Sequence, residues 1–258
     1  MLIGLISYSQ STASQQIEIF RIQAPQLDSD KQIWVYKPIN YQNSRNAYKV
    51  IYMHDAQNLF DRETSFAGEW KIDEILDSIY NQQTIIVGIE HGNEKRLDEL
   101  TPFHHEKYGG GKGDIYLEFI VKTLKPYIDK NYRTISAPEH TSIMGSSLGG
   151  LLSFYAVLKY PDVFGNAGIF SPSFWYTDDI YSFAQASEIP KTQKFYFVIG
   201  TEESETAVAE QQKMVDLLLN KGVNENQIRN KIVNGGKHNE DFWNKEFLEA
   251  YLWLVEKK

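Results

Sequence analysis

Short apolar runs alternate with longer amphipathic segments along almost the whole chain. Runs such as KVIYM at 49–53 and TIIVGI at 84–89 lack polar alternation, and their length and β-branched content predict strands buried on both faces. The expected strands are residues 16–23, 31–36, 49–53, 84–89, 141–144, 166–170, 195–199 and 227–233.

The amphipathic segments carry apolar residues three and four positions apart, which is the spacing of one helix face. In EWKIDEILDSIY, for example, Ile72, Ile75 and Ile79 would lie together. The expected helices are residues 69–80, 114–124, 148–159, 178–186, 205–220 and 240–256. Two early strands followed by repeated strand–helix units predict one α/β domain, with a mostly parallel central sheet and helices on both faces.

The composition fits a globular domain and narrows its partners. Of the 258 residues, 42% are hydrophobic and 23% charged, so the chain can bury a large core. The net charge of -8 leaves no basic stripe to neutralise phosphates, so we expect no nucleic-acid partner. The aromatic content of 14% fits a ring-filled core, and it also fits a cleft whose rings stack on aryl or sugar substrates.

The N-terminus and the absence of cysteine bear on compartment and chemistry. Residues 1–15 combine a short apolar run with small polar residues, which fits the remnant of a signal peptide or a flexible terminus. We therefore take residues 16–258 as the domain, and we favour a periplasmic or secreted protein over a cytoplasmic one. No other segment approaches the length needed to span a membrane, so we expect no membrane partner. The absence of cysteine excludes disulfides, thiol nucleophiles and thiolate metal sites.

Two predicted connections are longer than is usual in a compact domain. Residues 58–68 and 91–113 would each form a functional lid or a mobile loop. The second contains YGGGKGD at 108–114. This stretch lacks the spacing of a phosphate-binding loop and follows no strand, so we interpret it as a flexible hinge.

One glycine-rich turn has the pattern of a catalytic nucleophile. Gly145, Ser147 and Gly149 satisfy G-x-S-x-G between an expected strand and an apolar helix. The glycines leave room for a strained strand-to-helix turn that exposes the central hydroxyl. The pattern therefore predicts Ser147 as the nucleophile, with Ser146 as a neighbour that supports the turn.

A serine nucleophile needs a base to take its proton. For this motif the chain order is serine, acid, histidine, with the histidine on the loop after the last strand. Of the six histidines, only His238 follows that strand, so we expect it to be the general base.

The acid that orients the base is expected after the penultimate strand. That strand leads into TEESE at 201–205, where three carboxylates compete. The usual offset from the strand-ending glycine selects Glu203, and Glu202 and Glu205 stay as alternatives. Some of these acids would also suit the N-terminus of the following helix.

Two backbone N–H groups are expected to stabilise the oxyanion of the tetrahedral intermediate. Leu148, the residue after the nucleophile, should supply one. The loop after the third strand, HDAQN at 54–58, should supply the other, with Gln57 as first choice and Ala56 as second. The pairs and clusters His54-Asp55 and His104-His105-Glu106 lack the spacing of a metal site, so we expect no metal.

Several segments together resemble the putative-esterase (esterase D-like, enterochelin-esterase-like) family of the α/β-hydrolase superfamily. The resemblance spans residues 33–254 and rests on YMHDAQNLFD, GEWKIDEILD, RLDELTPF, GSSLGGLLSFY, YPDVFGNAGIFSPSFWY and GGKHNEDFW. It implies the α/β-hydrolase fold, and it places the family's nucleophile on Ser147, its base on His238 and its acid in the loop at 201–205, on Glu203.

The resemblance also bears on the oxyanion loop and on substrate binding. The family's oxyanion loop falls on residues 55–57, which supports Gln57, although the family usually has glycine where this chain has Ala56. Four further residues border the cleft in relatives and are expected either to bind substrate or to pack in the core. They are Trp70, Arg96, Phe174 and Trp175.

These expectations describe a serine carboxylic-ester hydrolase that works through an acyl-enzyme and needs no metal or organic cofactor. Its partner would be a small-molecule or polysaccharide-linked ester, and acetyl or feruloyl esters of carbohydrates fit the aromatic-rich loops. A siderophore trilactone esterase, or an acyltransferase on the same site, is the alternative. A non-catalytic carbohydrate-binding protein fits least, because both nucleophile and base are present.

Overall fold

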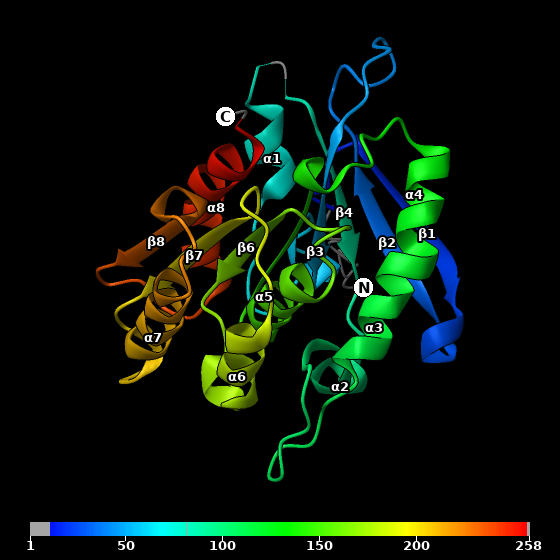
Figure 1. The fold of residues 1–258 in the computed structure, drawn as a ribbon. Helices are drawn as coiled ribbons and strands as arrows, with labels where there is room; N and C mark the ends of the chain where they lie inside the picture. The colour runs from blue at the N-terminus through cyan, green and yellow to red at the C-terminus, as the bar shows by residue number, and fades with distance from the viewer. Residues whose placement is uncertain (1–10, 81, 257–258) are drawn as a thin grey trace, which may run out of the picture.

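The computed structural model describes residues 11–80 and 82–256. An eight-stranded sheet crosses the molecule in the order β1-β2-β4-β3-β5-β6-β7-β8 (Figure 1). The strands β1, β2 and β4 pair antiparallel, and all other neighbours pair parallel. The strands are β1 (Ile17–Ala24), β2 (Ser29–Tyr36), β3 (Lys49–His54), β4 (Thr84–Ile89), β5 (Thr141–Ser146), β6 (Asn166–Phe170), β7 (Lys194–Gly200) and β8 (Ile228–Val233).

Helices cover both faces of this sheet, so the predicted α/β class is confirmed (Figure 1). None of the described helices is long and apolar enough to cross a membrane. The helices are α1 (Ile72–Asp77), α2 (Arg96–Leu100), α3 (Gly113–Phe119), α4 (Lys125–Asn131), α5 (Leu148–Lys159), α6 (Asp179–Ala186), α7 (Ala207–Asn220) and α8 (Glu240–Val255).

The buried side chains form two apolar layers, one on each face of the sheet. Successive strand residues point to opposite faces. In β3, Ile51 and Met53 therefore join the layer that contains residues of α1 and α8, whereas Val50 and Tyr52 join the layer that contains residues of α3 to α7. Because both layers use the same strands, the sheet binds the whole domain together.

Two helices differ from the predicted bounds by more than two residues. The predicted helix 69–80 is limited to α1, because Lys71 has a positive φ of 54° and the Trp70 N–H donates to the Asn58 carbonyl rather than to a helical turn. The predicted helix 114–124 instead continues to the end of α4. It does so through the π-helical segment Ile120–Leu124, and Pro126 follows directly after that segment.

The glycine-rich stretch in the second long loop forms an ordered turn. Gly109, Gly110 and Gly111 have φ values of 84°, 76° and 93°, which favour glycine, and His105 and Gly109 exchange two backbone hydrogen bonds of 2.8 Å. The Tyr176 hydroxyl donates to the Gly109 carbonyl at 2.5 Å. The glycines thus serve the turn conformation, which is a different role from the predicted hinge.

The segment before β1 is bound to acidic side chains. The Ser11 hydroxyl donates to Asp61 at 2.6 Å, and the Ser14 N–H donates to Asp73 at 2.7 Å. Residues 1–10 of the predicted leader or flexible terminus lie outside the described residues. The boundary at residue 16 stays a prediction.

The carboxyl ends of the parallel strands meet at one edge of the sheet, which is where ligands bind in open α/β folds. Asp55 follows β3, Ser147 follows β5 and Ser171 follows β6. Glu203 and His238 lie on the loops after β7 and β8. The fold therefore gathers residues from five separate segments at this edge.

Candidate active site

Ser147 occupies a strained position between β5 and α5. Its φ is 58° and its ψ is -122°, a conformation that residues with side chains rarely adopt. The turn is held by the Ser147 N–H, which donates to the Phe170 carbonyl at 2.9 Å, and by the Ser147 carbonyl, which accepts from the Ser173 N–H at 3.1 Å. The hydroxyl is thus presented at a fixed place above the sheet edge.

The two glycines of the motif give His54 room, and Gly145 also packs against the backbone of Gly149. A Cβ on Gly145 would lie 2.9 Å from His54 Cδ2, and a Cβ on Gly149 would lie 3.2 Å from His54 Cβ. The His54 ring is buried, and its Nδ1 lies 3.1 Å from the Tyr116 hydroxyl. Burial lowers the pKa of His54 to about 4. A neutral imidazole therefore supports the turn from below.

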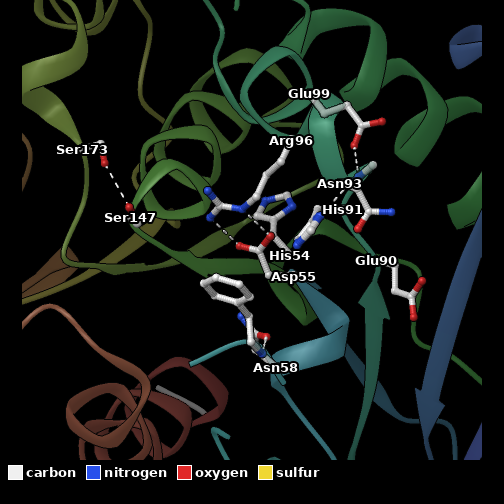
Figure 2. A network of polar contacts seen from close by, with 12 residues as sticks. His54, Asp55, Asn58, Glu90, His91, Asn93, Arg96, Glu99, Ser147 and Ser173 are labelled. Carbon is white, nitrogen blue, oxygen red and sulfur yellow. Dashed lines mark hydrogen bonds and ion pairs between the residues drawn. The ribbon is translucent and has the colours of Figure 1, made fainter. Parts of the chain in front are cut away.

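The hydroxyl of Ser147 faces a second serine. Its Oγ lies 3.3 Å from Ser173 Oγ, as Figure 2 shows. Among the described residues, the Ser147 hydroxyl makes a side-chain hydrogen bond to Ser173 and none to His238. The motif analysis missed Ser173, because only the fold brings the loop after β6 beside the turn after β5.

The structure brings the predicted base and acid together. His238 Nδ1 lies 2.8 Å from Glu203 Oε2. The two side chains differ in exposure, with 40% of the His238 side chain and 3% of the Glu203 side chain open to solvent. The contact with Glu203 uses Nδ1 and leaves the other ring nitrogen, Nε2, for a different partner.

The buried carboxylate of Glu203 has hydrogen-bond donors on its other oxygen. Oε1 accepts from the Ser171 hydroxyl at 2.6 Å and from the Gly200 N–H at 2.8 Å. The Trp243 indole in turn donates to Ser171 at 2.8 Å. The Trp243 ring also meets the His238 ring edge to face, with centroids 5.1 Å apart. These contacts compensate the burial of the acid and hold the imidazole in one orientation.

The alternative acids lie in different surroundings. The side chain of Glu202 is 57% exposed, and its carboxylate lies 3.7 Å from Lys237 Nζ. Glu205 is exposed before α7. Within the described residues, Glu203 is the carboxylate of this loop that contacts His238.

The predicted oxyanion donors lie on two short helical starts. Leu148 is the first residue of α5, and Gln57 lies in the 3-10 turn Ala56–Asn58. In the described part of the chain neither N–H donates to a protein group. The positive φ of this loop, 59°, falls on Asp55 and not on Ala56, so alanine can stand in the family's glycine position without strain.

An ion pair holds the loop after β3. Arg96 of α2 donates from Nε and Nη2 to the two carboxylate oxygens of Asp55, both at 2.8 Å (Figure 2). Burial alone would raise the pKa of Asp55, but the Arg96 guanidinium outweighs it and holds that pKa below its usual value. The pair therefore ties α2 to Asp55, which directly precedes Ala56 and Gln57, the candidate oxyanion donors of this loop.

The four predicted substrate-binding residues divide by exposure. Trp70 and Phe174 are 2% and 1% exposed, and their burial in the apolar layers favours the packing interpretation. Arg96 is engaged with Asp55. Trp175 is 54% exposed, which leaves its ring open to a ligand.

One group of acids in the described residues has the spacing of cation ligands. Carboxylate oxygens of Glu69, Asp73 and Glu74 lie within 4.8 Å of one another. Burial raises the pKa of Asp73 to about 8, and Asp73 also accepts the Ser14 N–H. The cluster contains none of the predicted catalytic residues.

The comparisons with known proteins agree with this arrangement of the fold. A family model described as "Putative esterase" matches residues 24–254. The chain belongs to that family.

Three curated relatives illustrate the range of the family. The uncharacterized protein YbbA of Bacillus subtilis is 30% identical, with 88% of this chain and 94% of YbbA covered. The endo-1,4-beta-xylanase/feruloyl esterase of Xylanibacter ruminicola is 25% identical over 64% of this chain and 22% of its own length. The siderophore triacetylfusarinine C esterase of Aspergillus fumigatus is 27% identical over 52% of this chain and 47% of its own length.

Solved structures share the fold at low sequence identity. The BES protein from Bacillus cereus superposes with a TM-score of 0.75 at 20% identity, with 98% of this chain and 100% of that chain covered. The enterobactin esterase FES from Shigella flexneri superposes with a TM-score of 0.74 at 16% identity, with 95% of this chain and 61% of that chain covered. These likenesses show that the chain shares its fold with both proteins.

Proposed function

We propose that the protein is a serine carboxylic-ester hydrolase that works through an acyl-enzyme on Ser147. The observation that carries the proposal is the contact of His238 with the buried Glu203, on loops that end at the same sheet edge as the strained Ser147 turn. Family membership supports ester hydrolysis in general. The serine mechanism and the substrate are the parts that we propose here.

In the first half of the reaction, Ser147 Oγ attacks the ester carbonyl carbon. His238 Nε2 takes the hydroxyl proton, while Glu203 holds Nδ1–H and stabilises the imidazolium that forms. For this step the Ser147 hydroxyl has to exchange its Ser173 partner for His238. The imidazolium then gives its proton to the departing alcohol, and the acyl group stays on Ser147 as an ester.

In the second half, water replaces the alcohol. His238 takes a proton from the water, the hydroxide attacks the acyl carbonyl, and Ser147 leaves with the proton returned by His238. Each tetrahedral intermediate carries a negative oxygen. The N–H groups of Leu148 and Gln57 are the donors that we assign to it, and losing one such donor typically costs roughly 100- to 1000-fold in rate.

Two substrate classes are supported by relatives. Acylated carbohydrates, with acetyl or feruloyl esters, are our first choice, since one relative is described as a feruloyl esterase. Siderophore esters are the second, since another is described as a siderophore esterase. Neither class requires nucleic acid, membrane or metal as a partner of the reaction.

Hydrolysis assays on two variants test this proposal. We expect Ser147→Ala and His238→Ala to lose nearly all activity on p-nitrophenyl acetate while circular dichroism shows them folded. A panel of acetyl-xylan, methyl ferulate, a siderophore trilactone and short nitrophenyl esters then ranks the substrate classes. Wild-type activity in Ser147→Ala would remove the nucleophile from the account.

A further inference from the structure

Two exposed aromatic rings stand next to the loop that contacts the nucleophile. Trp175 is 54% exposed and Tyr108 is 44% exposed. Trp175 lies two residues after Ser173, whose hydroxyl is 3.3 Å from that of Ser147. Large aromatic rings that stay exposed leave apolar surface in contact with water, which is unfavourable. Beside a reaction centre such rings commonly mark a binding surface.

The residues before and after Trp175 fix its place in the chain. It is the middle residue of the 3-10 turn Phe174–Tyr176, and the residues before and after it are each 1% exposed. Phe174 packs in the apolar layer that contains residues of α3 to α7, and the Tyr176 hydroxyl donates to the Gly109 carbonyl. Trp175 is thus forced outward on an anchored turn, and presenting it to a ligand costs little conformational entropy.

Contacts of the neighbouring residues hold Tyr108 beside the turn Phe174–Tyr176. It lies in the 105–109 turn that is closed by the paired hydrogen bonds of His105 and Gly109. The His105 ring contacts both Tyr108 and Tyr176, with centroids 4.7 and 5.3 Å away. Two segments that are far apart in the sequence therefore present their rings as one rigid surface.

The two exposed rings form a corner. The centroids of Tyr108 and Trp175 are 5.7 Å apart, and their planes meet at 87°. A third flat ring can lie parallel to one wall and edge-on to the other, which are the two arrangements that aromatic pairs prefer. The Trp175–Tyr176 contact is also edge-on, at 68°, so no described ring stacks flat on Trp175.

We propose that Trp175 and Tyr108 form a subsite for an aromatic ring of the substrate. The preferred ester then carries a phenolic or other aryl group close to the bond that is cleaved. This inference rests on the proposed function, and it narrows the substrate class to aryl-bearing esters. A hydroxycinnamoyl ester and a catecholate siderophore both supply such a ring.

The subsite is tested by comparing an ester with a ring and one without. The pair is methyl ferulate and methyl hexanoate, assayed with wild type, Trp175→Ala, Tyr108→Ala and the ring-retaining Trp175→Phe. We expect Trp175→Ala to raise KM for methyl ferulate about tenfold, with less than about a twofold change for methyl hexanoate. Trp175→Phe should recover most of the loss. Equal effects on both esters, or none, would overturn the subsite.

A matched control and a third substrate sharpen the result. Tyr80 is 91% exposed on the connection that leads into the amino end of β4, at the opposite edge of the sheet. Tyr80→Ala should leave both KM values unchanged. A catecholate trilactone assayed with the same variants ranks the two sources of ring, since the ring that binds the corner more tightly should show the larger rise in KM.

Failure of the subsite and failure of the esterase proposal are distinguishable. If wild type hydrolyses no ester, the proposed mechanism fails, and the corner is then judged by binding alone. In 15N-labelled Ser147→Ala, the indole N–H signal of Trp175, assigned from Trp175→Phe, should shift when ferulate is added. A signal that stays in place at millimolar ferulate and at millimolar catecholate overturns the subsite.

Discussion

Strained backbone at single residues marks the site. Six described non-glycine residues have a positive φ, and three of them, Asp55, Ser147 and Ser171, lie at the site with values of 59°, 58° and 44°. All three directly follow parallel strands at the same edge of the sheet. Such conformations are costly and tend to collect where function requires a fixed geometry. These three residues are the nucleophile, the start of its oxyanion loop and a hydrogen-bond donor to the acid.

Sequence spacing could find some of these residues and not others. Ser147 and His238 are placed by short motifs with a fixed chain order, and the offset after β7 selected Glu203. Ser173 and the Asp55–Arg96 pair have no local pattern, because their partners are 26 and 41 residues away. Their roles appear only when the strand ends are brought together.

The acid assignment predicts a difference between two neighbouring glutamates. Glu203→Gln keeps the shape of the buried side chain but removes the charge that orients and stabilises the His238 imidazolium. We expect kcat to fall by about 100- to 10000-fold. Glu202→Gln, at the exposed neighbour, should stay within about threefold of wild type. Steady-state kinetics on p-nitrophenyl acetate decide between them, and the reverse ranking would move the acid to Glu202.

The buried His54 predicts a dependence of stability on pH. Burial lowers its pKa from 6.5 to about 4, so the folded state holds the neutral ring while the unfolded state gains a proton between these values. Above pH 6.5 the ring is neutral in both states, so His54 takes nothing from the stability of the fold. As pH falls from 6.5 toward 4, its titration lowers the free energy of unfolding by on the order of 3 kcal/mol.

Urea unfolding of wild type and His54→Leu at pH 7 and pH 4.5 measures this contribution. Other titrating groups act on both proteins, so the difference between their pH slopes isolates His54. Wild type should lose more stability than the variant on acidification. Identical slopes would show that the folded state does not disfavour the His54 proton.

At the scale of elements, tertiary contacts set the helix ends that the sequence pattern missed. The apolar spacing of residues 69–80 is real, but the chain enters α1 only after Trp70 has bonded to the loop at Asn58. The five-residue α2 was not predicted, since it is too short for periodicity to show. It is nevertheless the element that carries Arg96 to Asp55.

The α2 ion pair predicts a larger cost than a surface pair does. Arg96→Met leaves the nearly buried Asp55 carboxylate without its partner, and we expect a loss of about 3 kcal/mol in the free energy of unfolding. Lys112→Met removes an exposed pair with Asp98 and should cost less than about 1 kcal/mol. Chemical denaturation measures both, and equal losses would show that the Asp55 pair does not hold the loop.

At the scale of the whole molecule, one sheet is shared by two apolar layers. The sequence predicted the mostly parallel sheet and its helix-covered faces, because buried parallel strands read as continuous apolar runs that alternate with amphipathic helices. The layer with α1 and α8 contains Trp34, Trp70 and Trp243, whereas the buried residues of the other layer include no tryptophan.

The shared strands predict one cooperative unfolding transition. Tryptophan fluorescence reports mainly the α1 and α8 layer, and far-UV circular dichroism reports all helices, most of which pack on the other face. We expect the two probes to give the same midpoint in urea. Separate midpoints would show that the layers unfold as independent units.

The central claim is that an acyl group is carried by Ser147, and covalent labelling tests it most directly. The protein is treated with a fluorophosphonate, digested, and the modified residue located by tandem mass spectrometry. We expect a single adduct on Ser147, no labelling of Ser147→Ala, and slow labelling of His238→Ala. An adduct on Ser146 or Ser173, or equal labelling of wild type and Ser147→Ala, would contradict the account.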